Sequence, residues 1–139
     1  MAELSYLPQT AGNLDTMDFT AARMPGLTYK LDTTRGRIKG TTDEKDAVLQ
    51  AVYIMLNVER YAYPIYSRNY GVELSELIGK PKDYAMSEIK RLITEALSQD
   101  DRITGVTDWD FTTGRNTVTA SFTINTIYGD ISAEKEVEI

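Results

Sequence analysis

Two segments of the chain carry apolar residues at intervals of three and four, which is the spacing of one face of an α-helix. In the first segment, 42–58, the apolar positions are Ala47, Val48, Ala51, Val52, Met55 and Leu56. In the second segment, 83–98, they are Ala85, Met86, Ile89, Leu92, Ile93, Ala96 and Leu97. The pattern predicts two amphipathic helices, each with one face buried against a core.

Capping and helix-breaking residues mark the ends of the predicted helices. Thr41 followed three residues later by Glu44 fits a capping box, in which each side chain accepts a hydrogen bond from the other residue's backbone N–H. The first long helix is therefore predicted to begin here. Residues 72–79 predict a short helix between the two long ones, and Pro81 keeps it from continuing.

The remaining segments alternate between apolar and polar residues, which is typical of strands. Residues 27–32 and 37–40 predict two short strands before the first helix. After the second long helix, 103–112, 116–127 and 131–139 predict three longer strands joined by turns.

The last predicted strand has two distinct sides. One side carries Ile131, Ala133, Val137 and Ile139, with Lys135 as its one charged residue. The other side carries Ser132, Glu134, Glu136 and Glu138. We expect the apolar side to cover the domain's own helices.

The order of elements predicts an α+β fold, in which two long helices and a short helix pack on one face of a small antiparallel sheet. That sheet is expected to end in a C-terminal three-stranded meander, with core residues that include Val52, Leu92, Trp109 and Phe122. Residues 27–139 are expected to form a single domain. Residues 1–26 show no clear period; we interpret them as an extended N-terminal arm docked on another surface, the alternative being a disordered tail.

Composition argues against several classes of function. The chain has 139 residues and a net charge of −6, with no cysteine and no histidine. A negative chain lacks the basic face that phosphates require, which argues against nucleic-acid binding. Disulfides, thiol chemistry, histidine acid–base catalysis and nearly all zinc sites are excluded, and no apolar run is long enough to span a membrane. We therefore expect no metal and no cofactor.

The segment 57–74 is the main candidate for a functional site, because it holds four of the nine tyrosines beside the charged pair Glu59-Arg60. Tyrosine and arginine dominate protein–protein hot spots, so one interpretation is a contact site. Another is a structural corner, in which the charged pair ends the helix and Pro64 fixes the turn. A glycosidase needs a second carboxylate across a groove from Glu59, and the sequence marks none.

The spacing of residues across this segment resembles a known family. The matching residues are Leu56, Glu59, Arg60, Pro64, Tyr70, Gly71, Leu74 and Leu77. The pattern is similar to that of baseplate wedge proteins of contractile phage tails, the lysozyme-like wedge family, with relatives among type VI secretion baseplate subunits. The inserted residues 65–69 resemble the branch found in PBSX-type prophage tails and contractile bacteriocins, or tailocins.

The resemblance implies a structural protein and not an enzyme. Such a protein is expected in the baseplate of a virion or tail-like particle, after synthesis in the bacterial cytoplasm. Its expected partners are other wedge proteins and the tail sheath protein, whose first ring assembles on it, with tail tube or hub proteins as further candidates. The alternatives are a peptidoglycan-cleaving glycosidase of the same particle and a soluble adaptor.

Two groups of residues are predicted to bind these partners. The first group, in the 57–74 segment, is Glu59, Arg60, Tyr61, Pro64, Tyr66, Tyr70 and Gly71. The second group, in the last strand, is Ile131, Ala133, Lys135, Val137 and Ile139. A strand at the edge of a sheet has unpaired backbone groups, so we expect a partner's strand to add there.

Overall fold

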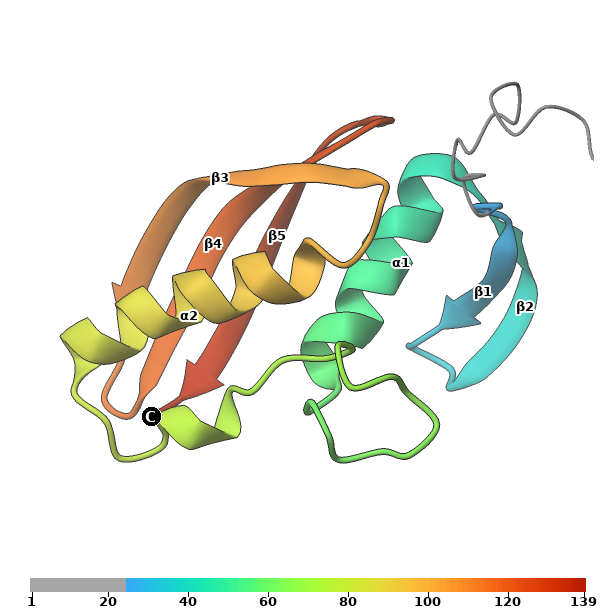
Figure 1. The fold of residues 1–139 in the computed structure, drawn as a ribbon. Coiled ribbons are helices and arrows are strands. Elements are labelled where there is room, and N and C mark those ends of the chain that lie inside the picture. Colours follow the sequence, from blue (N-terminus) through green and yellow to red (C-terminus); the bar gives the residue numbers. More distant parts are fainter. Residues whose placement is uncertain (1–24) are drawn as a thin grey trace, which may run out of the picture.

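The computed structural model describes residues 25–139, and the arm predicted over 1–26 lies almost wholly outside them. Two antiparallel sheets and two long helices make up the fold (Figure 1). In chain order the elements are β1 (Thr28–Asp32), β2 (Arg37–Thr42), α1 (Glu44–Asn57), the short 3₁₀ helix η2 (Ser75–Leu77), α2 (Lys82–Leu97), β3 (Ile103–Thr113), β4 (Thr117–Thr126) and β5 (Gly129–Glu138). The predicted mixed α/β class is confirmed.

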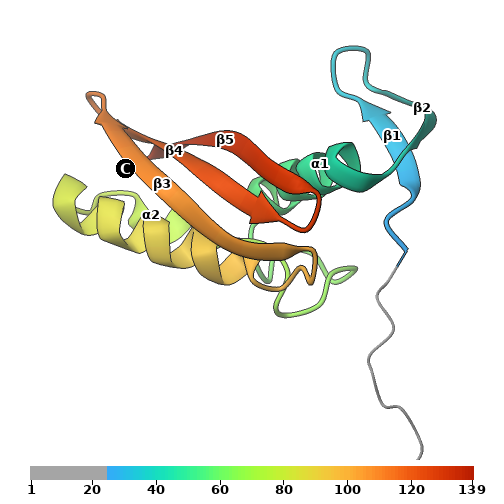
Figure 2. The same ribbon diagram turned by 90° about the horizontal axis from the view of Figure 1, so that it is seen from above.

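The larger sheet has the strand order β3-β4-β5, so β4 is its central strand. Alternate residues of β4 are buried, as the alternation predicts: Val118, Ala120, Phe122 and Ile124. α2 lies across β3 and β4, and α1 contacts α2 and β5 (Figures 1 and 2). The apolar side of the central strand therefore belongs to the same core as the two helices.

The ladder between β4 and β5 is regular along its whole length. It runs without a register shift from Thr126 opposite Gly129 to Thr117 opposite Glu138. β5 begins at Gly129 rather than at residue 131, because the turn takes up only the residues between Thr126 and Gly129. β5 consequently pairs with β4 over its whole length without a bulge.

The core contains three of the four residues predicted for it. Val52, Leu92 and Phe122 are buried. Trp109 is only half-buried, since β3 is an edge strand and its residue Asp108 forms a bulge with φ +55°. The indole still stacks on Phe122, with ring centroids 4.7 Å apart.

β1 and β2 form a separate two-stranded sheet and do not extend the larger sheet. The side-chain amide of Gln50 on α1 holds this hairpin at two points. The backbone N–H of Leu31 donates to Gln50 Oε1, and Gln50 Nε2 donates to the carbonyl of Tyr29, each over 2.8 Å. One amide thus occupies the outer edge of β1 as a neighbouring strand would.

The predicted capping box at the start of α1 is wrong. Thr41 belongs to β2, where it lies opposite Tyr29, because the pairing with β1 continues through the threonines that precede the helix. The N-cap is Asp43, whose Oδ1 accepts a hydrogen bond from the backbone N–H of Glu44 over 2.7 Å. Aspartate is among the preferred N-cap residues, because its side-chain oxygen can accept from the free backbone N–H groups of the first turn.

The short helix predicted over 72–79 is reduced to the single turn of η2. Val72 cannot join it, because its backbone N–H donates to the carbonyl of Val58 over 3.0 Å in an extended bridge. Gly79, with φ +83°, ends the segment, because glycine adopts positive φ without steric cost.

Replacing Leu92 with alanine is expected to lower the free energy of unfolding by ~2–5 kcal/mol, since a buried leucine leaves a cavity. A urea titration followed by circular dichroism measures the loss. Leu49→Ala is the matched control, because this leucine is 43% exposed and its loss is expected to cost less than ~1 kcal/mol. Equal losses for the two variants would contradict the packing of α2.

Candidate partner-binding surfaces

The corner, which is the segment between α1 and η2, forms a loop closed at its base by backbone hydrogen bonds. Val72 N–H donates to the Val58 carbonyl over 3.0 Å, and Arg60 N–H donates to the Val72 carbonyl over 3.3 Å. Gly71 has φ +96°, and a Cβ on it would lie 2.6 Å from the Val58 carbonyl oxygen. The closure therefore depends on glycine at this position.

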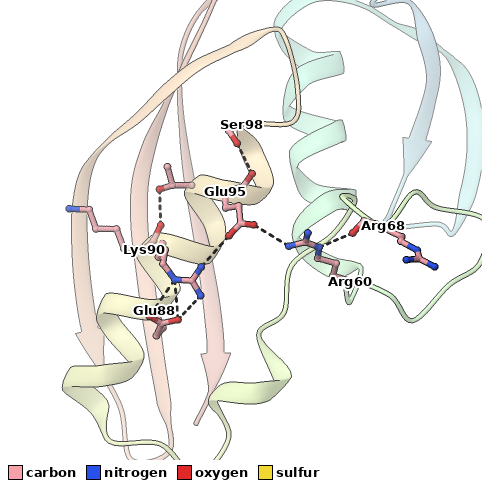
Figure 3. Close-up of polar contacts among 8 residues, drawn as sticks. Arg60, Arg68, Glu88, Lys90, Glu95 and Ser98 are labelled. Atoms are coloured by element: carbon pink, nitrogen blue, oxygen red, sulfur yellow. Dashed lines mark hydrogen bonds and ion pairs between the residues drawn. The ribbon is translucent and has the colours of Figure 1, made fainter.

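Arg60 ties this corner to α2. Its Nε donates to the carbonyl of Arg68 over 2.8 Å, and its Nη1 lies 3.2 Å from Glu95 Oε1. Arg91 then pairs with both Glu95 and Glu88, so charges of alternating sign run from the corner along the helix (Figure 3). The Arg60 side chain is 19% exposed, and both of its bonds serve the protein's own fold.

Glu59, the neighbour of Arg60, points to a different partner. Its Oε1 accepts a hydrogen bond from the hydroxyl of Ser75 over 2.6 Å, which joins the end of α1 to η2. The two residues of the charged pair therefore have different partners: Arg60 contacts Arg68 and α2, whereas Glu59 contacts η2. These contacts agree with the interpretation that Glu59 and Arg60 hold a structural corner. That the pair also binds a partner stays a prediction.

The tip of the corner, residues 61–69, is exposed throughout. The ring of Tyr66 stacks on Tyr70 at 4.4 Å and meets Tyr63 edge-on at 6.4 Å. Tyr70 lies at the inner end of this row, where burial, together with Tyr66 and Asp100, raises its pKa. Tyr61 and Pro64, in the same segment, are also exposed to solvent. The rings of Tyr63, Tyr66 and Tyr70 thus pack against one another within an otherwise exposed loop.

The side chains predicted as partner-binding in β5 face inward. Ile131 and Val137 are buried, and Ala133, Lys135 and Ile139 are half-buried. Lys135 Nζ donates to Asn57 Oδ1 over 3.0 Å, and burial lowers the pKa of its ammonium group. These side chains hold β5 on the core, so the strand can offer a partner only its backbone edge and its other row of side chains.

The backbone groups of β5 alternate between its two edges. Ile139 N–H donates to the Asn116 carbonyl over 2.9 Å, in the register of the β4–β5 ladder. Hydrogen-bonded and non-hydrogen-bonded positions alternate along an antiparallel pair. The backbone groups that point away from β4 are therefore those of Ser132, Glu134, Glu136 and Glu138.

β5 has the one regular open edge among the four sheet edges of residues 25–139. The edge of β3 is broken by two register shifts. The edge of β1 is bonded to Gln50, and β2 is interrupted beside Gly40, where φ is +74° and the register with β1 shifts. Bulges and charges of this kind are common protection against edge pairing.

A groove of about 240 Å³ joins the β5 edge to the base of the corner. It brings Glu59 together with Lys135 and Val137 from the two predicted groups. The other predicted corner residues lie outside it. Ser75 and Ile78 also line the groove. The local sequence pattern does not predict this position, because it depends on the closure of the corner.

Residues 25–139 contain no group of three carboxylates placed to hold a metal ion. Neither long helix has both the length and the apolar content needed to cross a membrane.

Comparison with known proteins relates the chain to a family and to a curated relative. Residues 23–129 match the model of the contractile injection system sheath initiator family. The chain is also 41% identical over 117 residues to the phage-like element PBSX protein XkdS of Bacillus subtilis (strain 168), with 79% of this chain and 81% of that protein covered. The expected similarity to a protein of the PBSX phage-like element is confirmed.

Gly71→Ala is expected to lower the free energy of unfolding by more than ~2 kcal/mol, because it adds both strain at positive φ and a clash with the Val58 carbonyl. Gly36→Ala is the control, since φ is +61° there but no atom lies within 4 Å of the added carbon. That variant should lose only ~1 kcal/mol. Thermal and urea unfolding of both proteins provide the comparison, and similar losses would show that the close approach is unimportant.

Proposed function

The chain belongs to the sheath initiator family of contractile injection systems, and from this premise we propose that it is a baseplate wedge component that starts the sheath by accepting a strand at β5. Membership in the family implies a structural protein rather than an enzyme, and interaction with sheath and baseplate components. It also suggests a virion or tail-like particle as its location.

The open edge of β5 is the observation that carries this proposal. Its outward backbone groups lie at regular intervals over ten residues, whereas the other three edges are interrupted or occupied. A strand from the first sheath subunits can bond to these groups and extend the sheet. Backbone bonding supplies contact along the strand, and side chains set the register.

The side chains of β5 on the face away from the core favour a particular kind of strand. Glu134, Glu136 and Glu138 are exposed at alternate positions. Three like charges oppose pairing of β5 with an identical strand from another copy. A sheath arm that carries lysine or arginine would meet them favourably.

The corner is proposed as a second contact, with other wedge proteins. Tyr61, Pro64 and Tyr66 are exposed at its tip, while Arg60 and Gly71 hold its base. An aromatic surface held in place before binding loses little conformational freedom when a partner arrives. In this proposal residues 27–139 act as one domain, residues 1–26 form an arm, and tail tube or hub proteins are further neighbours.

Glu136→Pro tests strand addition at β5. Proline removes the backbone N–H at this position, which points away from β4, so the protein should stay folded while sheath assembly from the baseplate fails. Negative-stain microscopy of tails that contain only the variant measures assembly, and circular dichroism of the purified protein measures folding.

Lys135→Pro is the control for the direction of the bond. The N–H of Lys135 faces β4, so this variant should lose stability in a way that Glu136→Pro does not. Full-length sheathed tails built with a folded Glu136→Pro protein would refute strand addition at this edge.

Arg60→Ala tests the corner. We expect the isolated domain to remain folded but assembly with wedge partners to weaken, since the loop loses its bonds to the Arg68 carbonyl and to Glu95. Lysine should be a poor substitute, because one ammonium group cannot reproduce the spread donors of a guanidinium.

Arg91→Ala is the matched control for Arg60→Ala. It also removes a pair with Glu95 but leaves the corner's own bonds intact. Co-purification of each variant with the baseplate proteins, followed by counting of assembled particles, separates the two. Normal assembly with Arg60→Ala would show that the Glu59-Arg60 pair has no role in the interface.

A further inference from the structure

We propose that the groove beside the C-terminal half of β5 anchors one bulky apolar side chain of the incoming strand, between two cationic side chains of the same strand. This inference rests on the proposed addition of a strand at β5 and specifies the chemistry of that strand. It concerns the groove of about 240 Å³ that the β5 edge shares with the segment 72–78.

The floor of the groove is apolar. It is formed by side chains that are nearly inaccessible to solvent: Leu56, Val72, Leu74 and Val137. Ile78 stands on the rim opposite β5 and is 62% exposed. An exposed isoleucine above an apolar floor is a surface that gains from being covered.

Two of the polar side chains around the groove, Glu59 and Lys135, already have partners within the chain. Glu59 accepts from Ser75, and Lys135 donates to Asn57. Neither group therefore requires a polar atom from an incoming strand. What an incoming strand can cover in residues 25–139 is therefore the apolar floor and rim, beside the exposed carboxylates of Glu136 and Glu138.

The register of an added strand determines which of its side chains enters the groove. Residues directly opposite each other on neighbouring strands point to the same face of the sheet. The residue opposite Val137 therefore points into the groove. The residues opposite Glu136 and Glu138 point to the other face, beside those carboxylates. The strand that fits has a cationic, an apolar and a cationic residue in succession.

This pattern distinguishes the sheath arm from other occupants. A second copy of β5 would place glutamates against glutamates and is opposed by charge. A nucleic acid would bring phosphates to the same carboxylates. An extended arm of alternating basic and apolar residues satisfies both the groove and the charges.

A synthetic peptide provides the test. The probe is Thr-Lys-Val-Lys-Leu-Lys-Val-Lys-Thr, whose sequence reads the same in both directions, so strand polarity does not matter. Titration into the ¹⁵N-labelled full chain, followed by NMR, is expected to shift the outward amides of Glu134, Glu136 and Glu138. Replacing the central leucine with serine should weaken binding about tenfold.

Variants of the protein complete the design. Ile78→Ser should weaken binding of the leucine peptide about tenfold and should make the leucine and serine peptides nearly equal. Ile38→Ser is the matched control, because Ile38 is 65% exposed, similar to Ile78, but lies on β2 away from the groove. It should leave the affinity unchanged.

The outcomes separate the two proposals. If the peptide binds and Glu136→Pro prevents binding, but neither serine change has an effect, strand addition stands and the anchor in the groove is refuted. If the peptide does not shift the β5 amides, or Glu136→Pro does not affect its binding, strand addition fails and the anchor fails with it. A tenfold loss of affinity with the serine peptide and with Ile78→Ser, and no further loss when the two changes are combined, supports the anchor.

Discussion

The burial of one side of β4 is the constraint on which the other features depend. Val118, Ala120, Phe122 and Ile124 bring the central strand against α2, in one core with α1. Once β4 is oriented in this way, the uninterrupted ladder orients β5 as well, with Ile131 and Val137 on the core side. Its glutamates must then lie on the opposite face and its unpaired backbone at the margin of the sheet. The partner-binding properties proposed for β5 therefore follow from hydrophobic packing one strand away.

Local periodicity predicted the helices and strands well because burial determines them. The apolar stripes of the helices and the alternation in β4 and β5 correspond to the faces that are buried. The errors lie where backbone pairing between distant residues overrides a local signal. Thr41 has the sequence of a cap but pairs with Tyr29, and Val72 has the sequence of a helix start but bonds to Val58. No local pattern contains those contacts.

The candidate surfaces could be predicted only in outline. The sequence singles out Glu59 and Arg60, yet it cannot show that their partners are Ser75 and Glu95, which lie far along the chain. The edge position of β5 could be expected of a last strand in a meander. That the other edges are blocked, in one case by the single side chain of Gln50, depends on three-dimensional contacts. The groove depends on the closed corner and has no signature of its own.

Neighbouring residues of β5 point in opposite directions, and this alternation affects how the protein can evolve. At one set of positions, which includes Ile131 and Val137, side chain and backbone both serve the domain. At the alternate set, which includes Glu134 and Glu136, both are turned outward. Under the proposed strand addition, mutations at the outward set change the preferred partner at little expense in folding stability. A lineage can therefore follow changes in a partner's arm by exchanging a few charges, while its own architecture stays constant.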